Sequence, residues 1–312
     1  MPGSQPDTPL SVSAIGDRTT VVETRIAKAE RFGFPEDERV DLAESVEAEF
    51  MYQYESMAPD AVKSQLGISA TRIGGGVVLS MRNDVTGYWS KAVGFGASEP
   101  VTSALIDKVL EFYRAESSPG AVIQISPAAL AGDWDQIAAG RNFRAQDPWF
   151  KLMCRVEDFG AAVRTELRVG PVAKNDAREW AAVALRGFGM PEEGLGDMMA
   201  TAAADHPSFR PFAAWDGDEI VASANLFIHG EVGSLNSAAT LPDYRAKGAQ
   251  SALLAARAKA AAEAGCRWLV AETGVAHDRS NPSLNNMLRF GLRPRYERQN
   301  WAWAPNPTET TS

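Results

Sequence analysis

Apolar residues recur at helical or alternating spacing along most of the chain, and this pattern predicts a succession of short helices and strands. In the first half, helical spacing around Val46 and Phe50 among acidic residues indicates an amphipathic helix that packs on another element. Alternation and β-branched residues then indicate strands. The elements expected here are a helix after Pro35 through Tyr54, two or three strands within 68–95, a helix at 99–115, a strand at 121–126, a helix at 134–139 and a strand at 149–156.

The second half repeats this order of elements. A hairpin is expected to turn at Asp216-Gly217, because that dipeptide tolerates positive φ. A long Ala-rich helix is expected to close at Gly265 as its C-cap. The expected elements are a strand at 167–169, helices at 175–187 and 192–204, the hairpin at 209–230, a strand at 233–241, a helix at 249–264, a strand at 268–273, a helix at 281–290 and a strand at 296–303.

Length and this repetition together indicate two domains that arose by internal duplication. The chain has 312 residues, and single cores stop growing at roughly 250 to 300 residues. The segment between Asp158 and Arg164 has no strong periodicity, so we place the boundary there. The predicted organisation is a disordered tail at 1–16, domains at 17–160 and 161–304, and a disordered tail at 305–312.

Composition narrows the class of protein. A formal net charge of -9 argues against nucleic acid or an anionic membrane as the main partner, because either requires a basic face. The sequence shows no leader and no apolar run that could span a bilayer, which predicts a cytoplasmic location. Cys154 and Cys266 are too few for a disulfide framework, and with three scattered histidines they give no metal-ligand spacing. We therefore expect reduced structural thiols and no metal.

One loop carries the candidate chemistry. Residues 245–250, RAKGAQ, follow a strand and begin the Ala-rich helix, so backbone N–H groups and the positive end of the helix dipole meet there. Arg245 and Lys247 add cations, Gly248 permits close backbone approach and Ser251 offers a hydroxyl. This chemistry favours a pyrophosphate-bearing ligand over a solvated basic turn. The spacing differs from that of Walker and Rossmann loops.

This region resembles the GNAT superfamily of acyl-CoA-dependent N-acetyltransferases. The signature of that family is Arg or Gln, two residues, Gly, one residue, then Gly or Ala; Arg245 and Gly248 match it. Thr240-Leu241-Pro242 corresponds to the family's Val-x-Pro, and Asn281 through Gly291-Leu292 to its Asn helix ending in Gly-Phe. The resemblance covers about residues 164–303, and covers the first half in element order only.

The resemblance implies the fold class α/β (α+β), with two GNAT domains in tandem, each a mixed, mostly antiparallel sheet flanked by helices. In the first half the corresponding loop contains Glu99 and Pro100. The carboxylate would repel pyrophosphate and proline lacks an N–H donor, so we expect a degenerate domain without cofactor. That domain would serve as a scaffold, or as one wall of the acceptor pocket through Tyr88 and Trp89.

The family also implies where acetyl-CoA would bind as cosubstrate. Strand backbone would pair with the pantetheine arm, amides of the loop and first helical turn would hold the pyrophosphate, and an asparagine would contact pantetheine. The implied residues are Ala238, Ala239, Thr240, Arg245, Ala246, Lys247, Gly248, Ala249, Gln250, Ser251 and Asn281. Two positions depart from the family pattern. Gln250 replaces Gly or Ala, and Met287 replaces the tyrosine that protonates the departing thiolate in many members.

Catalysis needs a base for the amine, a donor to the oxyanion and an acid for the thiolate. Glu272, at the end of a strand beside the cofactor strand, is the candidate base; the alternative is a structural pair with Arg267 or Arg289. His229 and His277 are further candidate bases. The amide near Thr240 is the candidate oxyanion donor. Tyr296 is the candidate acid, with packing as its alternative role.

The predicted function is N-acetyl transfer from acetyl-CoA to a primary amine of a small molecule, directly and in a ternary complex. The acceptor pocket is expected to use residues 188–199 and the first domain, in a monomer or a homodimer. A mycothiol-synthase-like activity and acetylation of an antibiotic or amino sugar stay open within this class. Outside it, Gln250 and the missing tyrosine leave open a non-catalytic acyl-CoA-binding module, and a purely structural protein is the third alternative.

Overall fold

The computed structural model describes residues 40–275 and 281–306 of the chain. All of them belong to one structural unit, Pro35–Ser312. The predicted tail at 1–16 lies outside the described residues, and so do residues 307–312 of the predicted tail at 305–312.

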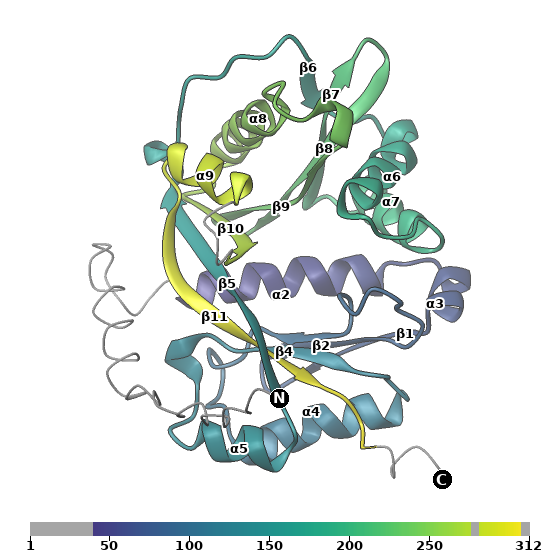
Figure 1. Ribbon diagram of the computed structural model, residues 1–312, viewed down its shortest axis with the longest axis vertical. Coiled ribbons are helices and arrows are strands. Elements are labelled where there is room, and N and C mark those ends of the chain that lie inside the picture. The colour runs from purple at the N-terminus through teal and green to yellow at the C-terminus, as the bar shows by residue number, and fades with distance from the viewer. Residues whose placement is uncertain (1–39, 276–280, 307–312) are drawn as a thin grey trace, which may run out of the picture. The chain divides into compact units, whose positions relative to one another are not determined.

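Helices and strands alternate through the first half of the described chain, in the order that the sequence predicts (Figure 1). They are α2 (Val40–Ser56), α3 (Asp60–Leu66), β1 (Ile68–Ile73), β2 (Gly76–Met81), β3 (Lys91–Val93), α4 (Ser103–Ala115), β4 (Ala121–Gln124), α5 (Trp134–Gly140) and β5 (Arg144–Arg155). Helix α3 was not predicted, because seven residues are too few to show a helical period. Strand β5 begins five residues earlier than predicted, in an exposed polar stretch that lacks alternation.

The second half repeats the order, again as predicted. Its elements are β6 (Arg168–Pro171), α6 (Ala177–Phe188), α7 (Leu195–Asp205), β7 (Phe209–Asp216), β8 (Glu219–His229), β9 (Val232–Thr240), α8 (Ala249–Glu263), β10 (Trp268–Gly274), α9 (Pro282–Arg289) and β11 (Arg293–Trp303). The β7–β8 hairpin turns where Gly217 adopts a φ of 60°, which confirms the predicted Asp-Gly turn.

The described strands form one sheet of 11 strands in the order β1-β2-β3-β4-β11-β5-β10-β9-β8-β7-β6. Neighbours pair antiparallel except for β3 with β4 and β9 with β10, which pair parallel. The pattern is therefore nearly symmetric about the central β11–β5 pair, as a duplicated unit would give. Each half contributes one of these two central strands, β5 between β11 and β10 and β11 between β4 and β5. The mixed, mostly antiparallel sheet is confirmed, and the domain boundary near residue 160 stays a prediction.

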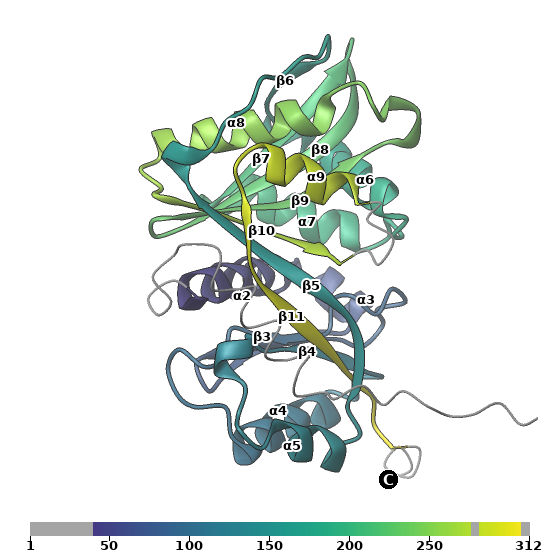
Figure 2. The same ribbon diagram turned by 60° about the vertical axis from the view of Figure 1, so that its left-hand side comes forward.

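Helices cover both faces of the second-half strands. Figures 1 and 2 show α8 and α9 on one face and α6 and α7 on the other. Helix α2 contacts α7, β8 and β9 of the second half as well as β1, β2 and β3 of the first. The core under α8 includes Leu226, Leu253 and Leu269, and the core under α4 includes Ile106, Val109 and Ile123. Helix α2 thus lies where strands of the two halves meet.

Nothing among the described helices is long and apolar enough to cross a membrane. The cytoplasmic location stays a prediction.

Candidate active site

Strands β9 and β10 begin as neighbours and then separate. They pair only over Trp268–Val270 against Val232–Ser234. Beyond that point β9 continues to Thr240 paired with β8, and β10 continues to Gly274 paired with β5. Because each strand keeps only its outer partner there, a gap opens between their C-terminal ends.

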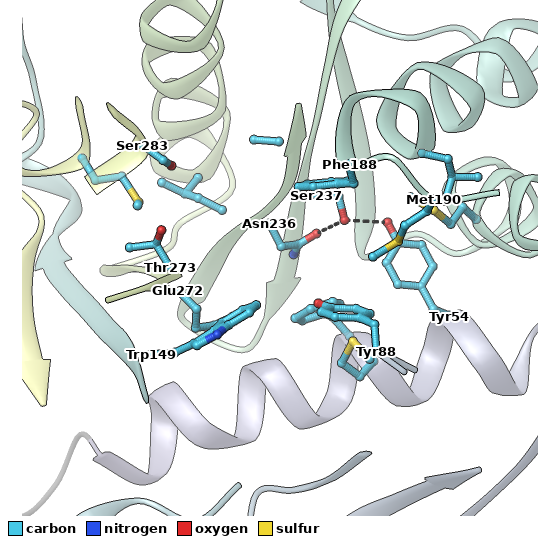
Figure 3. Close-up of a pocket in the computed structure, with 18 of the residues that line it drawn as sticks. Tyr54, Tyr88, Trp149, Phe188, Met190, Asn236, Ser237, Glu272, Thr273 and Ser283 are labelled. Carbon is cyan, nitrogen blue, oxygen red and sulfur yellow. Dashed lines mark hydrogen bonds between the residues drawn. The ribbon is translucent and has the colours of Figure 1, made fainter. Parts of the chain in front are cut away.

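A β-bulge lies in the part of β9 that faces this gap. Ser223 is opposite Ala239 and Asn225 is opposite Asn236, so two residues of β9 stand opposite one residue of β8. One of the two, Ser237, has a φ of 51°. A bulge of this kind turns backbone groups and a side chain away from their regular directions. The Ser237 hydroxyl lies 3.2 Å from the Tyr54 hydroxyl of α2 (Figure 3).

A buried arginine holds the bulge from the α8 face. Arg257 of α8 is 1% exposed, and its Nη1 donates to the carbonyl oxygens of Asn225 at 2.9 Å and Asn236 at 3.2 Å. Burial lowers the pKa of this guanidinium to about 9. Arg257 forms no ion pair within the described ranges, so carbonyl dipoles alone compensate its charge.

A cavity of about 460 Å³ occupies the gap between β9 and β10. On the α8 and α9 side it is lined by Gln250, Leu254, Ser283 and Met287. On the opposite side it is lined by Tyr54 of α2, by Trp149 of β5 and by residues of α6 and α7. Figure 3 shows Tyr88, Trp149 and Phe188 around it, with Ser237 and Glu272 from the two separating strands. The cavity therefore passes through the sheet and has walls from both halves of the chain.

The predicted acceptor residues of the first half, Tyr88 and Trp89, both line this cavity. From the predicted stretch 188–199, so do Phe188, Met190 and Met199. The structure thus brings together side chains that lie far apart in the sequence.

The predicted pyrophosphate loop packs against the segment that connects the halves. Gly248 has a φ of 82°, and a Cβ at this position would lie 2.3 Å from the carbonyl oxygen of Arg164. Thr165 Oγ1 donates to the carbonyl oxygen of Lys247 at 2.8 Å. Ala246 also has a positive φ, 64°. A glycine is therefore required at 248 by the loop's own packing, whatever ligand the loop binds.

The N-terminus of α8 is suited to an anion. No side chain caps it in the part of the chain that the structure describes, so the amides of Ala249, Gln250 and Ser251 lack a capping acceptor. Arg245 and Lys247 are exposed in the loop before it. Lys247 Nζ lies 3.9 Å from Asp216, an exposed and therefore weak pair.

A third cation that sequence reasoning did not assign to this place also reaches the first turn of α8. Arg289 of α9 donates from Nη2 to Ser251 Oγ at 2.6 Å. The sequence offers no local signal for this contact, because it joins two helices 38 residues apart.

The other predicted cofactor residues have mixed surroundings. Ala238, Ala239 and Thr240 lie in β9 beyond its last pair with β10, and a Cβ at Gly187 of α6 would lie 2.5 Å from that of Ala239. Asn281 is the N-cap of α9. Its Nδ2 donates to Gly274 O at 2.8 Å, which ties the end of β10 to the start of α9.

Gln250, the departure from the family signature, lines the cavity and is held in place on both sides of its amide. Nε2 donates to Ser283 Oγ at 3.0 Å, and Oε1 accepts from Asn286 Nδ2 at 2.5 Å. Met287, the second departure, lines the same wall.

Glu272 of β10 lines the cavity at one edge of a buried charge cluster, which comprises Glu44, Glu47, Lys151, Glu272 and Arg298. Its Oε1 accepts from Lys151 Nζ at 2.7 Å, and its side chain is 9% exposed. Burial and the nearby Glu47 carboxylate raise the pKa of Glu272, and the Lys151 ammonium opposes this rise. The two arginines expected as structural partners of Glu272 have other partners. Arg267 forms a salt bridge with Glu231 at 3.0 Å, and Arg289 donates a hydrogen bond to Ser251.

Arg298 and Lys151 both bind Glu47, and Arg298 also binds Glu44 at 2.7 Å. The acidic residues of α2 were expected on the polar face of an amphipathic helix. Glu44 and Glu47 are instead buried, at 3% and 2% exposure, because β5 and β11 supply buried cations to them. Sequence periodicity could not reveal partners that lie more than 100 residues away.

Tyr296 of β11 lies beside this cluster. Its hydroxyl donates to Glu44 Oε1 at 2.5 Å, and burial raises the pKa of the phenol well above its ordinary value. The residues lining the cavity do not include it. Of the other candidate bases, His229 is exposed at the end of β8 and His277 lies outside the described residues.

Cys154 and Cys266 are both buried free thiols, as predicted. Over residues 40–275 and 281–306, no group of three or more His, Cys, Asp or Glu side chains is placed to hold a metal ion.

Residues 176–291 match the model of the Acetyltransferase (GNAT) family. This part of the chain, from the start of α6 to the end of α9, is a GNAT-family domain. No curated protein matches the sequence.

Solved structures share the fold across both halves. A GCN5-related N-acetyltransferase from Kribbella flavida is 14% identical, covering 79% of this chain and 94% of that chain with a TM-score of 0.56. One from Sphaerobacter thermophilus is 11% identical, covering 77% and 76% with a TM-score of 0.54. A tandem GNAT protein from the clavulanic acid biosynthesis pathway is 13% identical, covering 83% and 96% with a TM-score of 0.53. These likenesses confirm the predicted fold class, and the degeneracy of the first half stays a prediction.

Proposed function

We propose that this protein is an N-acetyltransferase that moves the acetyl group of acetyl-CoA directly to a primary amine of a small molecule, in a ternary complex. The observation that carries the proposal is the cavity through the sheet between β9 and β10. A cofactor entering from the α8 and α9 side and an amine entering from the α2, α6 and α7 side would meet there.

In this proposal acetyl-CoA lies along the inner edge of β9. The backbone of Ala238 to Thr240 binds the pantetheine arm, since this stretch lies beyond the last pair with β10. The amides from Ala246 to Ser251, with Arg245 and Lys247, bind the pyrophosphate. Asn281 acts by holding the end of β10 against α9.

The reaction joins the amine nitrogen to the thioester carbonyl carbon and breaks the bond between that carbon and sulfur. Glu272 accepts the proton that the amine loses, for which its raised pKa is suitable. Backbone N–H groups at the Ser237 bulge donate to the oxyanion. The departing thiolate takes one proton from the Tyr54 hydroxyl, which lies 3.2 Å from the Ser237 hydroxyl and regains a proton from solvent, while Glu272 releases its proton to solvent. Met287, which lines the cavity where many family members have a tyrosine, has no proton to give. Tyr296 as the acid stays an untested alternative.

The test is amine-dependent release of free CoA thiol. The full-length chain is incubated with acetyl-CoA, with and without a panel of primary amines, and thiol is followed by its reaction with a chromogenic disulfide. We expect thiol release that requires both the amine and the protein, with one N-acetylated product per thiol.

Other outcomes would select the alternatives. Binding of acetyl-CoA without amine-dependent thiol release would support the non-catalytic module, the alternative that Gln250 and Met287 favour. No change in thermal stability with acetyl-CoA would contradict both the transferase and the binding module, and would leave a structural role.

A further inference from the structure

The acceptor side of the cavity has a continuous aromatic wall. The ring centroids of Tyr54 and Trp89 are 6.2 Å apart, those of Tyr88 and Trp89 5.2 Å, and those of Tyr88 and Trp149 6.4 Å. Methionines border this wall: Met51 of α2, Met190 of the loop before α7, and Met199 of α7. Aromatic rings and thioethers adapt to an apolar or aromatic body and offer few hydrogen bonds.

Negative charge is scarce on the same walls. The carboxylate among the lining residues is Glu272, and Lys151 already binds it at 2.7 Å. A second or third ammonium group of a ligand would therefore find no counter-charge there. Burying an unpaired ammonium group costs roughly several kcal/mol even after the surrounding protein relaxes.

Positive charge, by contrast, lies close by. Lys91 of β3 is 3% exposed, and its Nζ lies 3.6 Å from the centroid of the Tyr88 ring and 5.4 Å from that of Trp149. Neither Lys91 nor Arg257 forms a salt bridge with a carboxylate in the described part of the chain, although the charges of Glu47, Glu272 and Glu55 act on Lys91. Because Glu272 is the one carboxylate among the described lining residues, the cavity can match a single amine, which loses its proton to Glu272, as the acceptor group.

We infer that the acceptor is a small monoamine whose amino group is carried by an aromatic or similarly apolar body, and not a polyamine or an amino sugar. This inference rests on the transferase function proposed above. The volume agrees with it, because about 460 Å³ must hold both the acetyl end of the cofactor and the acceptor. A sugar would bury several hydroxyl groups against ring faces, where the Tyr hydroxyls and Trp N–H groups supply few hydrogen-bond partners.

The first test compares acceptors. Specificity constants are measured for 2-phenylethylamine, ethylamine, spermidine and glucosamine at one pH. Burying a phenyl ring contributes enough to predict about 30-fold higher kcat/KM for 2-phenylethylamine than for ethylamine. Spermidine and glucosamine should each have a lower kcat/KM than 2-phenylethylamine. A higher value for either of those two, or equal values for 2-phenylethylamine and ethylamine, overturns the inference.

Two adjacent residues on opposite faces of β5 supply matched variants. Trp149 lines the cavity, whereas Phe150 packs against the core under α8. Trp149→Leu should reduce the ratio of kcat/KM between 2-phenylethylamine and ethylamine about fivefold. Phe150→Leu should lower thermal stability and leave this ratio unchanged. Equal ratios in both variants would contradict the aromatic wall as the acceptor site.

A binding measurement separates failure of this inference from failure of the transferase proposal. 2-Phenylethylamine and spermidine are titrated calorimetrically into the protein saturated with CoA. We expect the aromatic amine to bind more tightly in the wild type, and to lose affinity in Trp149→Leu. If acetyl transfer occurs but spermidine is the better ligand, the substrate class is wrong and the function stands. If no amine is acetylated yet the aromatic amine binds selectively, the function fails and the pocket assignment stands.

Discussion

The two parallel strand pairs of the sheet, β3 with β4 and β9 with β10, differ in how far their strands continue beyond the last residues that pair. In the first half β3 ends at Val93, one residue after its last pair with β4. In the second half β9 continues from Leu235 to Thr240, and β10 from Ala271 to Gly274, after their last pair. Extended backbone on both sides of a gap can bind a ligand between the strands, whereas strands that end together leave no such edge. We call the gap between β9 and β10 the long split and the end of the β3–β4 pair the short split.

The helices that follow the two splits differ in whether a side chain caps their N-terminus. Thr102 caps α4, its side chain accepting from the Leu105 amide, so one amide of the first turn already has an acceptor. Helix α8 begins at Gly248 with no side-chain cap among the described residues. A helix start that lacks a cap can offer its amides to phosphate, and a capped start offers fewer.

The loops between strand and helix are both tightly packed, but against different neighbours. A Cβ at Gly96, where φ is 101°, would lie 2.3 Å from the Cβ of Ala129 in the short turn after β4. The Gly248 loop packs instead on the backbone of Arg164, outside the split. The first loop also contains Glu99 and Pro100, so the two loops differ in their charge, in their number of backbone N–H donors and in how they pack beside the strands. A repeated fold therefore does not imply a repeated site.

The largest expected effect is at the long split. Glu272→Gln should lower kcat about 10³-fold, because the amide cannot accept the proton from the amine. In the wild type, activity should rise with pH through a pKa raised above the ordinary value of 4.5, since the base acts only when deprotonated. This limb of the pH profile should disappear in the variant, as measured by thiol release across pH.

The control for that variant is Glu231→Gln, which also removes a salt-bridged carboxylate, but one at the surface against Arg267. It should leave kcat and the pH profile unchanged. An unchanged turnover in Glu272→Gln at every pH would remove Glu272 from the mechanism.

The next effect concerns a buried cation in the parallel strand pair of the first half, Lys91 at the start of β3. Burial lowers the pKa of Lys91 from 10.5 to about 8. Between these two values the unfolded chain binds a proton that the folded chain does not, so this residue makes stability rise with pH across that window. Below pH 8 both states are protonated, and the folded state bears the full cost of burial.

Lys91→Met should therefore be the more stable protein at pH 7.5, by about 3 kcal/mol at most, and should lose this advantage by pH 10.5. Urea unfolding of both proteins at the two pH values measures the difference. A constant difference between them would show that Lys91 does not titrate in this window.

The smallest effect compares the two loop glycines. Gly248→Ala and Gly96→Ala should each destabilise the fold by about 1 to 3 kcal/mol, because each introduces a Cβ clash at a positive φ. Only Gly248→Ala should also weaken acetyl-CoA binding, about tenfold, by displacing the amides at the start of α8. Thermal melting and calorimetric titration of the folded variants separate the two effects. Equal losses of affinity would argue against a single functional loop.

The sequence predicted the order of elements because apolar periodicity, the Asp216-Gly217 turn and the glycines after helices are local signals. It also located the RAKGAQ loop, whose strand-loop-helix setting depends on neighbouring residues. It could not predict that β5 and β11 are adjacent at the centre of one sheet, since strand pairing between distant segments leaves no local pattern.

The same limit applies to the site. Glu47, Lys151 and Arg298 look like surface charges in a sequence, and only their meeting between α2, β5 and β11 explains their burial. Tyr54 falls on the apolar face of its predicted helix and therefore looks like a core residue. Its position beside Ser237 depends on how α2 packs against β9.

The stoichiometry of acetyl-CoA binding tests the difference between the two splits most directly. Calorimetric titration of the full-length protein should give one equivalent per chain, with an affinity that Gly248→Ala weakens and Gly96→Ala leaves intact. Two equivalents per chain, or one equivalent whose affinity depends on Gly96 and not on Gly248, would contradict the account.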